Sequence, residues 1–257
     1  MIRNIYIIGD LHGSISPITA FMKRSGKEFS SADENVMICL GDVGANYYFD
    51  KTDKEFKEQL QALPFTYFII RGNHEQRPSL RLRKYPNRWH LETFFGEDVY
   101  VENDFPNIKY AMDEPAVYNI KGLSTFVIPG AYSVDKYYRL KKGWQWFEQE
   151  QLTREEMKHG KYLCKENRNS FDLVLSHTCP IIFVPTDLFL PVIDQSTVDK
   201  TMERYLGEIE YILNYKHWIW AHYHADRIYP EGRCIMLFQS VLPFDKLEGN
   251  ITQDMLI

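Results

Sequence analysis

Residues 5–13 read Ile5-Tyr6-Ile7-Ile8-Gly9-Asp10-Leu11-His12-Gly13 and predict a buried strand that ends at a glycine. Asp10 and His12 are two positions apart, so in extended chain their side chains share one face just past the carboxyl end of that strand. Ligands of α/β folds bind at this end of the strands. A carboxylate and an imidazole together make half of a site for a divalent first-row metal.

The same arrangement occurs twice more in the first third of the chain. An apolar run at 36–40 ends in Gly41-Asp42, and a run at 65–70 leads into Arg71-Gly72-Asn73-His74-Glu75. Helices are expected between the strands, one from Ser16 as N-cap to Gly26 and one from about Asp50 to Pro64. These βαβ units predict neighbouring parallel strands whose carboxyl ends lie side by side.

The remainder of the chain predicts a mixture of short strands and two further helices. From Trp89 to about Arg139 we expect antiparallel strands at 99–101, 117–120 and 126–128, with no strong helix between them. Helices are expected from a capping box at 153–156 to about Asn167, and from 196–199 to Leu213. Strands at 173–175 and 218–220 lead into Ser176-His177 and Ala221-His222-Tyr223-His224, a proline-interrupted loop covers 180–191, and a late strand covers 235–238.

Length and composition are those of an ordinary globular protein. The 257 residues contain no repeat and no flexible linker, so we expect a single domain over 1–257. A net charge of −5 argues against nonspecific capture of nucleic acid or of an anionic membrane. The four scattered cysteines, the strand beginning a few residues from the N-terminus and the lack of a long apolar run favour a cytoplasmic protein without a signal peptide or a membrane span.

The polar residues at the strand ends together provide the ligand types of a two-metal site. They are Asp10, His12, Asp42, Asn73, His74, His177, His222 and His224. Two dications about 3.5–4 Å apart need a shared anionic ligand, several imidazole and oxygen ligands, and a position open to water. Each motif alone is weak, because a single histidine is more often an ordinary polar residue, and we give that interpretation to His90, His159 and His217.

Taken together and in order, these motifs resemble the calcineurin-like metallophosphoesterase superfamily. The resemblance rests on Gly9-Asp10-Leu11-His12, Gly41-Asp42, Gly72-Asn73-His74-Glu75, Ser176-His177 and Ala221-His222-Tyr223-His224, and extends over most of the chain. The stretch 129–136 is similar to one in bacterial members. The resemblance implies a four-layer α/β/β/α sandwich, in which two stacked mixed sheets are flanked by helices and a dimetal centre lies at the strand ends.

The resemblance also implies a role for each matched residue. Asp10, His12, Asp42 and His224 would hold one metal, and Asp42, Asn73, His177 and His222 the other, with Asp42 as the bridge. A metal-bridging hydroxide would attack the phosphorus of a monoester or diester, and His74, off the metals, would protonate the leaving group. Such ligands accept Mn, Fe, Zn, Ni or Co, and manganese is our first choice.

The chain departs from related phosphatases after its second motif. Those enzymes carry an aspartate and an arginine there, whereas this chain continues Val43-Gly44-Ala45-Asn46. Arg71 is one candidate for contacting substrate, although it could equally pair with a carboxylate behind the site. The other candidates are Asn46, Arg77, Tyr132, Asp135 and Arg139, for each of which a packing or surface role is also open. The loops at 44–50, 131–151 and 178–192 are expected to decide which substrate fits.

Two alternative functions stay open at this point. A serine/threonine protein phosphatase is favoured by the stretch from Arg71 to Glu75 and disfavoured by the missing aspartate and arginine. A binding scaffold that has kept the fold without the chemistry is the alternative from another class, although no ligand has been lost. A nuclease is not favoured, because the acidic balance does not help binding to nucleic acid.

Overall fold

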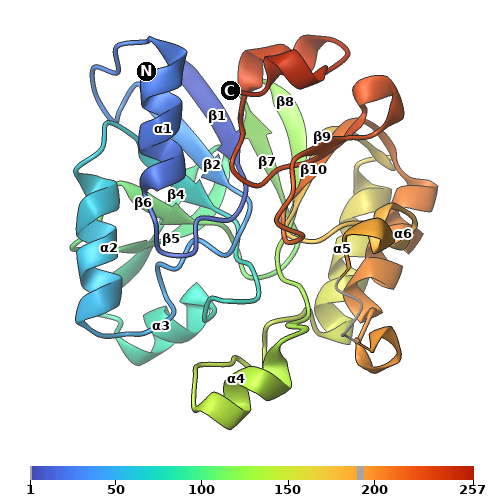
Figure 1. Ribbon diagram of the computed structural model, residues 1–257, viewed down its shortest axis with the longest axis horizontal. Coiled ribbons are helices and arrows are strands. Elements are labelled where there is room, and N and C mark those ends of the chain that lie inside the picture. The colour runs from blue at the N-terminus through green and yellow to red at the C-terminus, as the bar shows by residue number, and fades with distance from the viewer. Residues whose placement is uncertain (1, 190–193) are drawn as a thin grey trace.

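The computed structural model describes residues 2–189 and 194–257, and two β-sheets form its centre (Figure 1). The first sheet has seven strands in the order β13-β1-β2-β3-β6-β5-β4. They are β1 (Asn4–Ile8), β2 (Asn35–Cys39), β3 (Thr66–Ile69), β4 (Trp89–Phe94), β5 (Glu97–Glu102), β6 (Ile108–Tyr110) and β13 (Val241–Pro243). β1, β2 and β3 are parallel neighbours, as the βαβ pattern predicts, so their carboxyl ends share one edge.

The second sheet has six strands in the order β11-β12-β10-β9-β8-β7. They are β7 (Ala116–Ile120), β8 (Leu123–Ile128), β9 (Ser170–Ser176), β10 (Asn214–Trp220), β11 (Arg227–Ile228) and β12 (Cys234–Met236). β9 and β10 are parallel, and therefore they deliver His177 and His222 at a common edge. Strands of the two sheets contain or overlap all the strands expected in the second part of the chain, at 99–101, 117–120, 126–128, 173–175, 218–220 and 235–238.

The described residues form six α-helices (Figure 1). They are α1 (Ser16–Ser25), α2 (Lys51–Gln61), α3 (Pro78–Lys84), α4 (Lys136–Lys142), α5 (Arg154–Glu166) and α6 (Thr201–Ile212). Short 3₁₀ turns occur at Ile181–Phe183, Thr186–Leu188, Gln195–Thr197, Pro230–Gly232, Phe244–Glu248 and Gln253–Met255. α1 and α2 lie against the first sheet, and α5 and α6 against the second.

Three layers of buried apolar side chains join these elements. Ile7 and Ile38 of the first sheet pack with Leu173 and Ile219 of the second in the central layer. The outer layers join the first sheet to α1 and α2, and the second to α5 and α6. Burial of this apolar surface is the main force that holds the sheets together. The arrangement is the expected four-layer α/β/β/α sandwich.

Several local predictions were wrong or incomplete. α3 and α4 were not predicted, and α4 begins inside the region expected to lack helices. The region 89–139 is only partly antiparallel, because β6 pairs with β3 and β8 with β9 in parallel. Ser16 lies inside α1, whose N-cap is Ile15, and α6 starts at Thr201, later than expected. Of the expected loop 180–191, residues 190 and 191 lie outside the described part.

Other local predictions are confirmed. Gly26 ends α1 in the left-handed conformation, Asp50 caps α2, and Thr153 and Glu156 form the capping box of α5. The four cysteines are free and buried. Among residues 2–189 and 194–257, no helix has the length and apolar character needed to cross a bilayer.

Candidate metal centre

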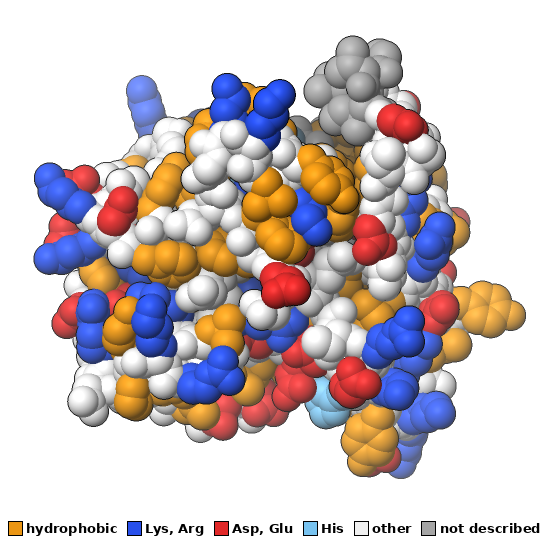
Figure 2. Space-filling view, turned by 90° about the horizontal axis from the view of Figure 1, so that it is seen from below, with side chains coloured by type: hydrophobic (Ala, Val, Ile, Leu, Met, Phe, Trp, Pro, Cys, Tyr) orange, Lys and Arg blue, Asp and Glu red, His pale blue; other side chains and the backbone are white. Residues whose placement is uncertain are grey.

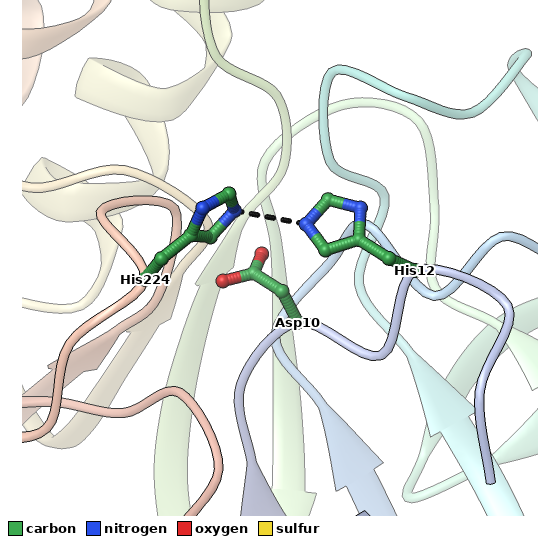
Figure 3. Close-up of side chains that lie close together, drawn as sticks. All are labelled: Asp10, His12 and His224. Carbon is green, nitrogen blue, oxygen red and sulfur yellow. Dashed lines mark hydrogen bonds between the residues drawn. The ribbon is translucent and has the colours of Figure 1, made fainter.

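Asp10, His12 and His224 converge between the ends of β1 and β10 (Figure 3). The ring nitrogens His12 Nε2 and His224 Nε2 are 2.8 Å apart, and the Asp10 carboxylate points toward the gap between the rings. Asp10 is buried, and its Oδ1 has no hydrogen-bond partner among the described residues. A buried oxygen without a partner is costly. This carboxylate and these two rings fit a divalent cation.

A second group lies beside the first and is built from Asp42, His177 and His222. Their ligand atoms all lie within 4.8 Å of one another. Asp42 also belongs to a third such group, with His12 and His74. His12 joins this third group to the first, and Asp42 joins it to the second. The Asp42 carboxylate therefore lies between the two sides of the centre, which is the position a bridging ligand would need.

One ring nitrogen of His177, Nε2, faces the side-chain oxygens of Asn73 and Asp42. His177 Nδ1 donates to the Leu40 carbonyl at 2.6 Å, so in the neutral ring Nε2 carries a lone pair. That nitrogen lies 2.9 Å from Asn73 Oδ1 and 3.5 Å from Asp42 Oδ1. Asn73 Nδ2 donates to Ser133 Oγ at 3.0 Å, which fixes the amide with its oxygen toward His177. Once its proton is lost, His177 Nε2 could bind a cation through this lone pair, with the Asn73 and Asp42 oxygens as neighbouring ligands.

The electrostatics of the centre suit cation binding. Burial alone would raise the pKa of Asp42, but His177 and His74 outweigh it and hold this pKa well below its usual range. Burial, followed by the charge of His177, lowers the pKa of His222 well below its usual value. Asp42 is therefore ionised and His222 neutral at pH 7, which are the forms that bind metals. Burial lowers the pKa of His177, but the Asp42 and Asp10 carboxylates outweigh it and raise this pKa to about 9, and burial raises the pKa of Asp10 well above its usual range. A cation would therefore displace protons from His177 and Asp10 when it binds.

The backbone around the centre has unusual conformations. His12, Asp42, His222 and His224 all have positive φ, between 46° and 70°. Non-glycine residues adopt this region rarely and at a cost, and such residues cluster at functional sites. Ala221, which precedes His222, is not among the residues with positive φ, so its methyl group causes no backbone strain there.

Two glycines allow the motifs to approach each other closely. A Cβ on Gly41 would lie 2.3 Å from His177 Nδ1, and one on Gly72 would lie 2.1 Å from Asp42 Oδ1. Both distances are far below van der Waals contact. The glycines that precede Asp42 and Asn73 are therefore needed for packing the ligands together.

Glu75 holds the second and third motifs in place, a role that sequence analysis did not assign. Its buried carboxylate accepts hydrogen bonds from the backbone N–H groups of Asp42 (3.1 Å), Gly44 (3.0 Å) and Gly72 (2.8 Å). The only signal in the sequence was its place directly after His74. Glu75 therefore acts as the anchor of the loop that presents Asp42.

Glu75→Ala is expected to lower the free energy of unfolding by at least about 3 kcal/mol, because it leaves three buried N–H groups unpaired. Urea unfolding in the presence of a chelator would measure this without a contribution from bound metal. Glu58→Ala, at an exposed position of α2, is the matched control and should change stability by less than about 0.5 kcal/mol. Equal stability of the two variants would show that Glu75 has no anchoring role.

A second supporting network connects Asn73 to the segment that carries α4. Ser133 Oγ accepts from Asn73 Nδ2 and from Arg139 Nη1, both at 3.0 Å, and donates to Glu150 Oε2 at 2.5 Å. Trp146 Nε1 also donates to Glu150, at 2.9 Å. Sequence analysis missed Ser133 and Glu150, because nothing in the pattern shows that residues 133 and 150 face Asn73.

Three of the six candidates for substrate contact point away from the centre. Arg71 is buried, 3.5 Å from Asp113 Oδ1, and donates to the carbonyl of Glu150. Asn46 accepts from Lys57 Nζ at 2.9 Å, and Arg77 pairs with Glu156 at the start of α5. These contacts are the packing roles that were open at the outset.

The other three candidates border cavities at the centre. Asp135 and Arg139 line a cavity of about 590 Å³ that also includes His12 and His74. Tyr132 lines a smaller cavity of about 220 Å³ that includes His222 and His224. The expected loops 44–50 and 131–151 both contribute to these walls, as does the described part of 178–192.

His74 stands at the border between the centre and the larger cavity. Its Nε2 is 3.8 Å from Asp42 Oδ2, and its ring lies nearly parallel to Tyr47, with centroids 5.9 Å apart. Its own backbone N–H donates to Asp42 Oδ1 at 2.8 Å, which fixes its position beside that carboxylate. The ring is close enough to reach either a bound cation or a group in the cavity.

Comparison with known proteins identifies the family. The sequence profile of the calcineurin-like phosphoesterases matches residues 3–226, which include every residue of the centre. The chain belongs to this family. It is accordingly a metal-dependent phosphoesterase. No curated protein is significantly similar to this phosphoesterase in sequence.

Similar folds occur among solved structures. The protein TT1561 of Thermus thermophilus is 12% identical, with 96% of each chain covered and a TM-score of 0.51. The phosphopantetheinyl hydrolase of Mycobacterium tuberculosis is 14% identical, with 92% of this phosphoesterase and 89% of that protein covered and a TM-score of 0.43. At such identities the likeness to TT1561 concerns the fold alone.

Proposed function

We propose that this phosphoesterase hydrolyses a phosphate monoester or diester with two divalent metal ions at the strand ends. Asp10, His12, Asp42 and His224 would hold one ion, and Asp42, Asn73, His177 and His222 the other. The observation that carries the proposal is the position of Asp42 in two adjacent groups of ligands. When bound, the ions would lower the pKa of a water molecule and offset charge on the phosphoryl oxygens.

The residues of the chain would perform the remaining steps. His74, placed at the edge of the larger cavity, would donate a proton to the leaving oxygen, a task that imidazole commonly performs. Burial lowers the pKa of His74 below its usual value, so the protonated donor would be most abundant in mildly acidic solution. Tyr47 supports the ring from one side. Glu75 and Ser133 would keep Asp42 and Asn73 in position through the hydrogen bonds described above.

The supporting observations also bear on the finer details. Arg139 and Asp135 remain our candidates for contacting substrate, since both line the cavity that holds His74. Manganese is proposed as the first choice among Mn, Fe, Zn, Ni and Co, all of which oxygen and imidazole ligands accept.

We propose that the chain forms one domain, since the central apolar layer contains residues of both sheets. We also propose a cytoplasmic location, which suits four unpaired cysteines.

Nucleic acid is not favoured as a substrate. On the face shown in Figure 2, most lysine and arginine side chains are interspersed with aspartate and glutamate, although several gather at the lower right. The net charge of the chain is −5, which does not help nonspecific binding to nucleic acid.

The test is hydrolysis by the purified protein with Mn²⁺. We expect turnover of p-nitrophenyl phosphate, of its bis ester or of both, which a chelator abolishes and added Mn²⁺ restores. No turnover of these esters or of a panel of nucleotides would contradict the proposal and favour the scaffold. Preferred turnover of a phosphopeptide would favour a serine/threonine phosphatase instead.

A further inference from the structure

Two separate cavities border the proposed metal centre, and different histidines line each of them. We define the Tyr47 cavity by Tyr47, Tyr48, His74, Arg139 and Trp144, and its volume is about 590 Å³. We define the Val198 cavity by Val134, Val184, Phe189, Val198 and Tyr223, and its volume is about 220 Å³. His12 belongs to the first cavity and His224 to the second, and their Nε2 atoms are only 2.8 Å apart. The two cavities therefore meet at the centre.

The larger cavity has the properties of a site for the leaving group. It holds His74, the proposed proton donor, whose ring is nearly parallel to Tyr47. Trp144 and Tyr48 are about half exposed and add further aromatic surface. Arg139 lies with its guanidinium carbon 5.4 Å from the Tyr47 ring centroid. A leaving oxygen must lie within reach of its proton donor, so the departing group belongs on this side.

The smaller cavity lies on the other side of the centre and has mainly apolar walls. Three valines and Phe189 contribute to it, and the Phe189 ring is nearly parallel to Tyr223, at 6.2 Å between centroids. Charged groups border it as well, namely Asp199, Lys200 and Glu203. Apolar cavities beside a reaction centre bind organic groups. A phosphate monoester has a single organic substituent, which is its leaving group and would lie in the Tyr47 cavity. The Val198 cavity would then hold no part of the substrate.

We propose that the natural substrate is a phosphodiester, with its leaving arm in the Tyr47 cavity and a smaller apolar or aromatic arm retained in the Val198 cavity. This inference rests on the proposed function. The oxygen of water loses a proton to solvent and forms a bond to phosphorus, the bond from phosphorus to the leaving oxygen breaks, and that oxygen takes a proton from His74, which regains one from solvent. The products are an alcohol in the Tyr47 cavity and a phosphate monoester in the Val198 cavity.

The test compares two diesters that differ only in the retained arm. Methyl p-nitrophenyl phosphate and phenyl p-nitrophenyl phosphate have the same charge and the same leaving group. We expect kcat/KM for the phenyl ester to exceed that for the methyl ester about tenfold or more, because the ring is buried in the Val198 cavity. Equal kcat/KM values for the two diesters would overturn the placement of a retained arm in the Val198 cavity. Turnover of p-nitrophenyl phosphate alone would overturn the diester assignment. Silence on all three esters would instead contradict the proposed function.

Filling the smaller cavity tests where the retained arm binds. Val198→Trp is expected to reduce the phenyl-to-methyl ratio to about one, because the indole occupies the space of the ring. Val134→Trp, at a half-exposed position of the same wall, should act in the same direction if Val198→Trp fails to fold. Tyr211→Trp, at an exposed position of α6, is the matched control and should keep the wild-type ratio. A wild-type ratio in a folded cavity variant would overturn the placement.

Discussion

His74→Ala is expected to lower kcat by about 10²–10⁴-fold and to leave the metal content unchanged. The reason is that the imidazole is proposed to donate a proton and not to bind a cation. Steady-state kinetics and elemental analysis of the same preparation would measure both properties. His90→Ala is the control, because His90 is an exposed histidine that contacts Asn103 away from the centre.

The leaving group provides a second measure of the same role. Phenol is a poorer leaving group than p-nitrophenol, so protonation should matter more for diphenyl phosphate than for phenyl p-nitrophenyl phosphate. The loss caused by His74→Ala should therefore be larger for diphenyl phosphate. Loss of a metal ion in this variant would instead make His74 a ligand, a result compatible with its place in a group with His12 and Asp42.

Asp42→Asn is expected to lower kcat/KM by at least about 10³-fold and to reduce the bound metal below two ions per chain. Asparagine keeps the shape and the oxygen that accepts the backbone N–H of His74, but removes the negative charge shared by the two groups. Asp33→Asn, at an exposed position outside the centre, controls for the change of charge. Two tightly bound ions in Asp42→Asn would contradict a bridging role.

Most of the fold could be predicted from the sequence because the polar motifs directly follow the strands. The apolar runs that end at Gly9, Gly41 and Ile70 are buried strands, and such runs stand out in a sequence. Parallel pairing then follows from the intervening helices. Asp10, Asp42 and Asn73 could be expected to meet for that reason alone. His177 follows a strand of the other sheet, so only the family resemblance indicated that it joins them.

The missed helices lacked the pattern that identifies a helix. α4 reads Lys-Tyr-Tyr-Arg-Leu-Lys-Lys, and its Tyr137, Tyr138 and Leu140 are all exposed, so no apolar face repeats at helical spacing. α3 is equally short, and only Pro78 within it is buried. Such segments depend on contacts with the rest of the molecule and not on their own periodicity.

Side-chain direction in the loops was the other feature hidden from sequence. Asn46 and Arg71 stand beside the motifs, but Asn46 turns toward Lys57 and Arg71 toward Asp113. The Glu75 side chain instead points toward the centre and accepts hydrogen bonds from three of its backbone N–H groups. Alternation of faces is regular in a strand but not in a loop, so spacing could not separate these cases.

The most direct test of the account is anomalous X-ray diffraction from crystals of the protein grown with Mn²⁺. We predict two anomalous peaks about 3.5–4 Å apart, one on each side of the Asp42 carboxylate. One peak should contact Asp10, His12 and His224, and the other Asn73, His177 and His222. A single peak, or peaks that do not touch Asp42, would contradict the two-metal centre.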